Sequence, residues 1–199
     1  MTHLEILAQG VQHWNDWRNH NPHVLPELAS ADLSRRDLEN FDFSTANLSG
    51  ANLQGTILNG ASFASANLSG ADMHGAWVMA ANLRGANLQD AYCHSANFNS
   101  SILAGAILRG ATFRSADLQM ANLEGADLTS ANLLRANLAG ATLRDANLTR
   151  ANLLRAQLVD TDLQNAKLTG CNVYGISVWD IRGRIGEQRD LAQVTQLGG

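Results

Sequence analysis

A period of five residues runs through most of this chain and limits what it can fold into. Starting from Leu33, every fifth residue as far as Val178 is apolar, mostly Leu, and from Ala31 to Asp180 no insertion breaks the register. Five matches neither the 3.6-residue period of a helix nor the two-residue period of a strand. The chain must therefore change direction within every repeat.

A second series, nearly always Ala, precedes each apolar residue by two positions. One large and one small residue in every five are thus expected to face inward, and the other three to face water. Two positions after the large residue stands a frequent Gly, such as Gly50 or Gly60, which tolerates the positive φ of a type II turn. Some corners have another residue in this slot, and there we expect a turn without positive φ: Ala80, Met120, Arg135, Arg150 and Arg155.

The repeating units, among them ANLSG, ANLQG, ANLRG and ADLTS, follow the pattern A(D/N)LXX. This pattern resembles the pentapeptide-repeat family, and the match covers about three quarters of the chain. The resemblance implies an all-β solenoid, a right-handed quadrilateral parallel β-helix with four pentapeptides in each coil. Stacked coils lie about 4.8 Å apart. Residues twenty positions apart then become neighbours on the surface, which turns the sequence into a map of the outer faces.

The repeat is expected to occupy residues 26–180, with an N-terminal helical cap and lead-in segment at 1–25 and a C-terminal cap or linker at 181–199. Thr2 and Glu5 form a capping-box pattern. Apolar residues then recur at helical spacing and predict a helix that covers the open core, or one that docks a partner: Leu4, Leu7, Val11, Trp14 and Trp17.

Both ends of the chain carry further signals. Pro22 and Pro26 are expected to end the N-terminal helix. The N-terminal leader also resembles that of many bacterial family members, cyanobacterial ones especially. The C-terminal segment is expected to cap the last coil through four apolar residues: Trp179, Ile181, Ile185 and Leu191.

Composition and motifs exclude several classes of protein. The net charge of −4 argues against a broadly basic nucleic-acid binder, and no apolar run is long enough to span a bilayer. Cys93 and Cys171 fall about four coils apart, too far for a disulfide.

With no signal peptide, we expect a cytoplasmic protein. Phosphate-loop, zinc and nucleophile-elbow motifs are missing, and the core has no room for a substrate, so we expect no enzymatic activity, no cofactor and no metal.

Departures from the repeat on the outer faces are the candidate partner contacts. Ile57 and Trp77 are expected to stack, with Met79 beside them and Tyr92 nearby. Exposed apolar groups of this kind often mark interfaces, although local packing or drift would explain them as well. Arg135 and Arg155 are also expected to stack. They could bind an acidic partner surface, or they could simply belong to a solvated face of mixed charge. His74 and His94 are expected to stack with Arg114 on one face. We interpret them as two solvated imidazoles, because a metal site would need further ligands that their neighbours do not supply.

These features favour a non-catalytic protein–protein interaction scaffold or regulatory module, a monomer or homodimer with no direct nucleic-acid or membrane binding. One alternative is a DNA-mimicking gyrase or topoisomerase modulator of the quinolone-resistance type. The resemblance implies that such proteins have an acidic surface, whereas residues 31–180 hold 13 acidic and 10 basic side chains. Another alternative is a repeat module of a larger multidomain protein, suggested by the abrupt C-terminus.

Overall fold

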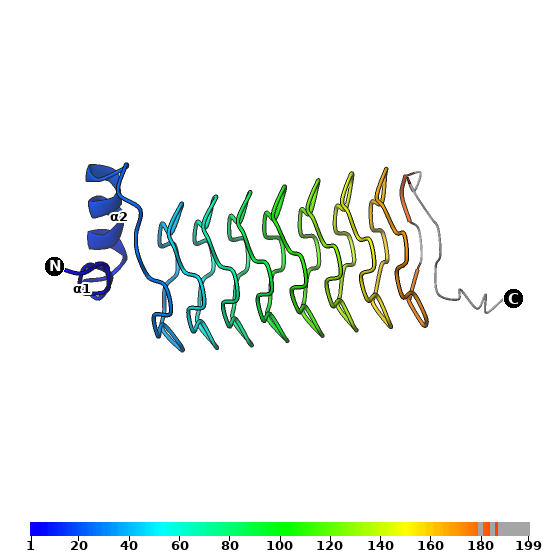
Figure 1. Cartoon of the computed structure of the whole chain (residues 1–199), viewed down its shortest axis with the longest axis horizontal. Coiled ribbons are helices and arrows are strands. Elements are labelled where there is room, and N and C mark those ends of the chain that lie inside the picture. Colours follow the sequence, from blue (N-terminus) through cyan, green and yellow to red (C-terminus); the bar gives the residue numbers. More distant parts are fainter. Residues whose placement is uncertain (179–180, 184–185, 187–199) are drawn as a thin grey trace, which may run out of the picture.

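The computed structural model describes residues 1–178, 181–183 and 186, which form a straight rod with a helical cap at its N-terminal end (Figure 1). The cap contains α1 (His3–Leu7) and α2 (Val11–His20). Beyond it the extended segments pair through isolated parallel bridges, each joining residues twenty positions apart, from Glu27↔Asn47 to Asp162↔Arg182. The bridges confirm the twenty-residue coil that the resemblance implies, and stacked coils of four pentapeptides make a quadrilateral parallel β-helix.

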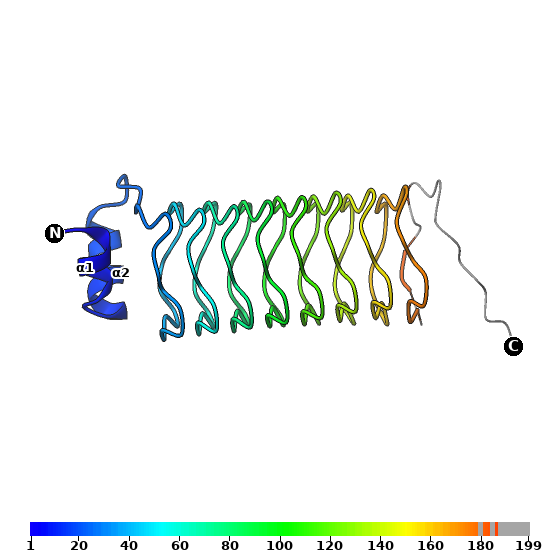
Figure 2. The ribbon, with the colours of Figure 1, turned by 60° about the horizontal axis from the view of Figure 1, so that its bottom comes forward.

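Hydrogen bonds between coils satisfy the backbone of the repeat. In the pentapeptide around Leu48, the Leu48 N–H donates to the Asn67 C=O of the next coil at 2.7 Å, and the Gly50 N–H donates to the Ser69 C=O at 2.9 Å. The Asn67 N–H donates back to the Ala46 C=O at 2.9 Å. Figure 2 shows the resulting ladder of coils from a second side. Each coil therefore depends on its neighbours for its shape.

Every described corner has its third residue at positive φ, whichever side chain it carries. Gly50 has φ of 63°, and the Ala51 N–H closes the turn on the Leu48 C=O at 3.0 Å. Ala80 and Met120 also have positive φ, at 53° and 59°, as do the arginines in this slot, so the expectation of a different turn at these corners was wrong. The reason is the hydrogen bonding between coils: the Ala80 N–H reaches the next coil, at 2.9 Å from the Asn99 C=O, and the corners from Ser30 to Arg155 share this bond. Hydrogen bonding offsets a left-handed conformation that costs roughly 1–2 kcal/mol.

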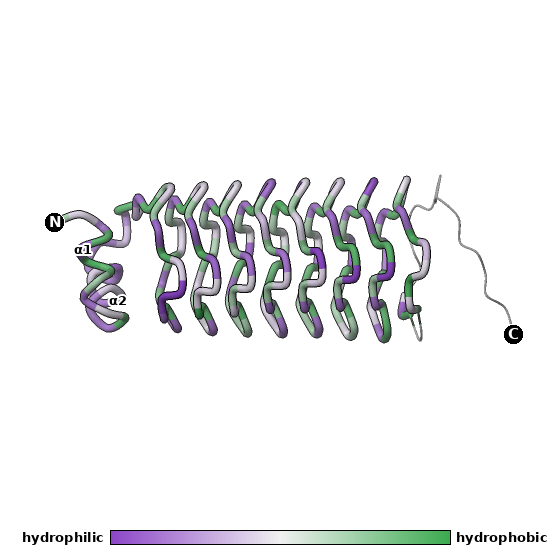
Figure 3. The backbone as a smooth tube through the Cα atoms, turned by 90° about the horizontal axis from the view of Figure 1, so that it is seen from below, coloured by the Kyte–Doolittle hydropathy of each residue, from purple (hydrophilic) through white to green (hydrophobic). Residues whose placement is uncertain are grey.

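The interior contains the two predicted inward series and little else. Leu, Phe and Ala of these series are almost all buried, and Phe43 and Phe63 stack with their ring centroids 5.2 Å apart. Hydrophobic and hydrophilic residues alternate along every coil in Figure 3. The frequent Asn or Asp before each large residue closes the turn: Asn52 Oδ1, for example, accepts the Gln54 N–H at 3.2 Å. This consensus residue is therefore structural.

The N-terminal cap differs in part from its prediction. The capping box is confirmed, with the Thr2 N–H 2.8 Å from Glu5 Oε2 and the Glu5 N–H 3.2 Å from Thr2 Oγ1. However, Gly10, with φ of 95°, separates two helices where one was expected. Because the break lets each helix present its own face, Leu4 and Val11 are exposed, contrary to the predicted apolar face. α2 ends at His20, just before the first proline, as predicted.

α2 takes the place of a preceding coil. In later coils, the groups equivalent to the Asp42 N–H, the Asp42 C=O and the Ser44 C=O bond to the coil before them. Here Trp14 Nε1 donates to the Asp42 C=O at 2.7 Å, and Asn15 Oδ1 accepts the Asp42 N–H at 2.9 Å. Arg18, buried although charged, donates to the Ser44 C=O at 2.8 Å. The cap thus covers the core and also satisfies part of the open backbone edge.

At the other end, Ile181 is partly buried and packs against the core. The remaining predicted cap residues, Trp179, Ile185 and Leu191, lie outside the described residues. The assignment of residues 181–199 as a cap or linker stays a prediction. Neither α1 nor α2, the helices of the described part, is long and apolar enough to cross a bilayer.

Candidate functional site

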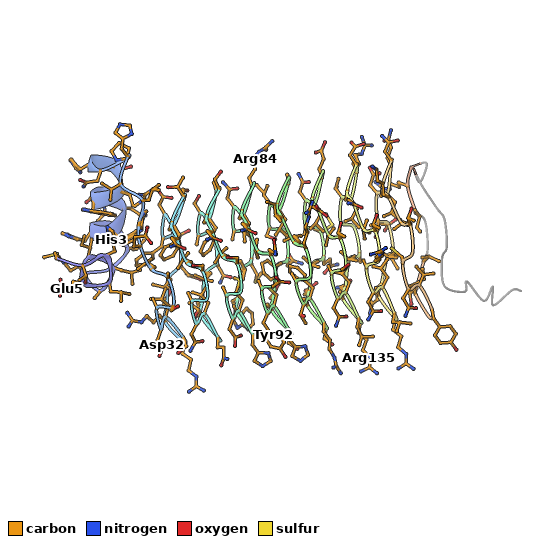
Figure 4. The ribbon with its side chains drawn as sticks, viewed as in Figure 1. His3, Glu5, Asp32, Arg84, Tyr92 and Arg135 are labelled. Atoms are coloured by element: carbon orange, nitrogen blue, oxygen red, sulfur yellow. The ribbon has the colours of Figure 1, made fainter. Side chains whose placement is uncertain are left out.

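Six of the seven predicted partner-contact residues lie on one corner of the rod or on the two faces that adjoin it, whereas Met79 lies at the next corner. We call the first of these the arginine corner; it consists of eight residue pairs, one per coil: Ser34–Arg35, Gln54–Gly55, His74–Gly75, His94–Ser95, Arg114–Ser115, Leu134–Arg135, Leu154–Arg155 and Tyr174–Gly175. Figure 4 shows Tyr92 and Arg135 along the lower edge of the rod. Residues that are up to 98 positions apart in sequence, Ile57 and Arg155, thus belong to one elongated surface.

An aromatic stack occupies the middle of this corner. The His74 and His94 rings are 5.1 Å apart and 12° from parallel, and the Tyr92 ring lies 6.1 Å from each. His94 Nδ1 is 2.8 Å from the Arg114 C=O of the next coil, and this hydrogen bond fixes the orientation of the His94 ring. The stack follows from the coil spacing. Side chains twenty positions apart are separated by about 4.8 Å, which lies within the range of centroid distances that stacked rings adopt.

Trp77 lies around the corner from this stack, three residues after His74 on the same coil, and is 52% exposed. Ile57 is its neighbour on the preceding coil, and the two are joined by a backbone bridge as predicted. Indole cannot accept the turn N–H as the consensus Asn does. Instead, Asn59 Oδ1 accepts the Met79 N–H at 3.1 Å from one coil away. The large exposed ring therefore occupies a turn position whose usual hydrogen bond comes from another residue.

The basic part of the corner follows the aromatic part along the rod. Arg114, Arg135 and Arg155 are exposed, and none forms an ion pair among the residues that the structure describes. Elsewhere Arg109 and Arg144 are neutralised by carboxylates of the next coil. The arginine corner has no Asp or Glu in any of its eight pairs. A row of exposed positive charge is the result, with Asp117 on the adjoining face.

Sequence reasoning missed a second surface on the opposite corner of the rod. An open groove of about 580 Å³ is lined there by Ala64, Ser65, Arg84, Gly85, Ala104, Gly105 and Glu124. Ile102 and Ile107 flank it, each 40% exposed. Both occupy the slot that normally holds Asn or Asp, and that departure from the repeat was the available signal. A groove of similar size lies between the cap and the first coil, lined by residues that include Leu7, Gly10, Arg36, Asp37, Glu39 and Phe41.

The described residues offer little reactive chemistry. Burial raises the pKa of the Cys93 thiol far above its usual value and that of Cys171 to about 11, so neither is a reactive thiolate. Both cysteines are buried and do not form a disulfide with each other, as their separation of about four coils predicts. Within residues 1–178, 181–183 and 186, no group of three or more His, Cys, Asp or Glu side chains converges as a metal site. The surface is suited to binding through charge and aromatic contact.

Comparison with known proteins agrees with this geometry. The family model described as "Pentapeptide repeats" matches eight copies, over residues 27–63, 46–85, 79–114, 106–145 and 136–173. HetL, involved in heterocyst differentiation regulation in the cyanobacterium Nostoc sp. strain PCC 7120, has a similar structure at 28% identity and a TM-score of 0.52, with 81% of this chain and 92% of HetL covered. These matches bear out the right-handed quadrilateral β-helix. No curated protein sequence matches significantly.

Two further solved structures are similar at lower scores. QnrB1, a plasmid-mediated fluoroquinolone resistance protein, is 21% identical with a TM-score of 0.49, covering 78% of this chain and 92% of its own. Rfr23 from the cyanobacterium Cyanothece 51142 is 29% identical with a TM-score of 0.31, covering 54% of this chain and 64% of its own.

Proposed function

Because the chain belongs to the pentapeptide-repeat family, we propose that it is a non-catalytic scaffold or regulatory module that binds another protein through the arginine corner. The observation that carries the proposal is the continuous row of exposed aromatic and arginine side chains on a rigid rod. Trp and Arg are the residue types that most often dominate binding energy at interfaces. HetL, a structural relative involved in regulation, supports a regulatory role.

The corner defines the chemistry of the partner. Arg114, Arg135 and Arg155 are one coil apart, so they present positive charges at intervals of roughly 5 Å along the rod. An acidic partner surface would complement this row, and an apolar pocket next to it would receive the exposed Trp77 ring.

Affinity capture from the native cells tests the proposal, with the wild type, Trp77→Ala and Arg135→Glu as baits. Each substitution is expected to lower recovery of a specific partner at least about tenfold, the effect of losing one interface anchor. Ile107→Ala and Lys167→Glu are matched controls, since both side chains are exposed on the face opposite the one that carries Trp77. Equal recovery by all five baits would refute the assigned surface.

The arginine corner also weighs against a DNA-mimicking gyrase modulator. The resemblance implies an acidic surface for such a protein, and here three arginines form a row without any acidic residue in the corner. A gyrase supercoiling assay, with and without a quinolone, decides between the two functions. Inhibition or protection at low concentration of this protein would favour the gyrase modulator.

A further inference from the structure

The corner opposite the arginine corner, which we call the notch corner, has a gap in its row of long side chains. Its central pair, Ala104–Gly105, is small, and Ile102 and Ile107 flank it on the two adjoining faces. In Figure 4, Arg84 stands out on the upper edge of the rod, opposite Arg135. The groove of about 580 Å³ described above runs along this gap.

Charges are placed symmetrically about the gap. Arg84 lies one coil before Ala104 and Glu124 lies one coil after it, and both line the groove. Both are exposed, and neither forms an ion pair within the described part of the chain. The corner has an apolar centre with a positive charge on one side and a negative charge on the other. A second copy of this corner that runs in the opposite direction therefore places its negative charge opposite the positive charge of the first.

We propose that the notch corner binds a second copy of this chain, with the two rods side by side and antiparallel about a twofold axis at Ala104. The axis places Arg84 opposite Glu124 of the partner subunit, and the same pairing recurs on the other side of the axis. Ile102 and Ile107 then face the same residues of the partner subunit across the centre. Such an interface is isologous, the commonest arrangement in homodimers.

The charges select both the orientation and the register. Parallel rods would bring Arg84 against Arg84 and Glu124 against Glu124, and like charges facing each other disfavour assembly. Sliding antiparallel rods by one coil loses both ion pairs, and in one direction it brings Arg84 against Arg144 of the partner subunit. One arrangement therefore satisfies every charge at the centre.

The dimer is weak, because two corners of narrow rods, each with a gap at its centre, bury less surface than the roughly 1,200–2,000 Å² of a stable interface. The arginine corner lies half a coil away and stays free in the dimer. The inference therefore does not depend on the proposed function, and failure of one leaves the other standing.

Analytical ultracentrifugation of the full chain, from about 1 to 500 µM, tests the proposal. The wild type is expected to shift from monomer to dimer over this range. Arg84→Glu and Glu124→Arg should each weaken dimerisation at least about tenfold, since either change replaces two attractions by two repulsions. An equimolar mixture of these two variants should dimerise again, because one chain is then doubly acidic and the other doubly basic. The double variant Arg84→Glu/Glu124→Arg should also dimerise.

Gly105→Cys tests the register, since the axis brings the two introduced thiols together and mild oxidation should cross-link them; the site is exposed, and a Cβ there meets no atom within 4 Å. Ser65→Cys, at the same corner two coils away and at a similar φ, is the matched control and should not cross-link. A wild type that stays monomeric throughout, charge reversals without effect, a mixture that stays monomeric, or equal cross-linking of the two cysteine variants would each overturn the proposal. Circular dichroism of every variant checks that the rod is intact.

Discussion

Replacing Trp14 by Ala should unfold the N-terminal end of the rod and leave the far end intact. The Trp14 side chain is fully buried and packs against Phe41 and Phe43, with ring centroids 6.4 and 5.6 Å away. Truncating a buried Trp to Ala costs about 3–5 kcal/mol, and leaving the Asp42 C=O without its donor adds about 1–3 kcal/mol. This loss approaches the whole stability of an ordinary domain, about 5–15 kcal/mol.

In a stack of coils the loss stays local, because each coil interacts only with its neighbours. Hydrogen-exchange mass spectrometry resolves this: amides of residues 27–46 should lose protection in Trp14→Ala, whereas those beyond residue 107 keep it. Trp14→Phe keeps most of the packing and removes the N–H donor, so its effect should be intermediate. Val11→Ala, which changes an exposed residue of the same helix, is the control and should alter protection little.

Two results would refute the reasoning. Unchanged protection of residues 27–46 in Trp14→Ala would mean that the helix does not stabilise the first coil. Equal loss of protection in every coil would mean that the rod unfolds as one cooperative unit, and the nearest-neighbour account would then be wrong.

Three further predictions concern the repeat itself. Ala86→Phe, at a fully buried small inward position, should overpack the core by about 1–3 kcal/mol or more; an unchanged melting temperature would contradict the inward assignment. Ala80→Gly should raise stability by up to about 1 kcal/mol, since φ there is 53°, and Gly60→Ala should lower it; denaturant titrations that give both changes the same sign would count against the corner geometry. Partial burial raises the pKa of Asp162, but hydrogen bonds from Arg144 and from the backbone outweigh it and hold the pKa below its usual value. The stabilisation is therefore present above about pH 4 and lost as the pH falls further, so Asp162→Asn should flatten acid unfolding between about pH 4 and 2; an identical slope would exclude this contribution.

Much of the fold follows from the period alone. Which side chains face inward could be deduced because each pentapeptide repeats the same pattern of large, small and polar residues. The twenty-residue coil needed the resemblance to a known family, since a period of five does not say how many units close a turn. With the coil length in hand, the stacking of His74 on His94 and of Ile57 on Trp77 also follows, because these pairs are twenty positions apart.

Other features depend on contacts that no local pattern contains. Ala80 adopts positive φ against its own preference because its N–H bonds to the next coil. Arg18 is buried, whereas Val11 of the same helix is exposed, because α2 must satisfy the open edge of the first coil as well as cover its core. The sequence by itself determined the interior of this protein, since burial repeats with the period. Only the tertiary structure decided the backbone conformation of the corners and the contacts of the cap, since there the partners of each group come from other coils.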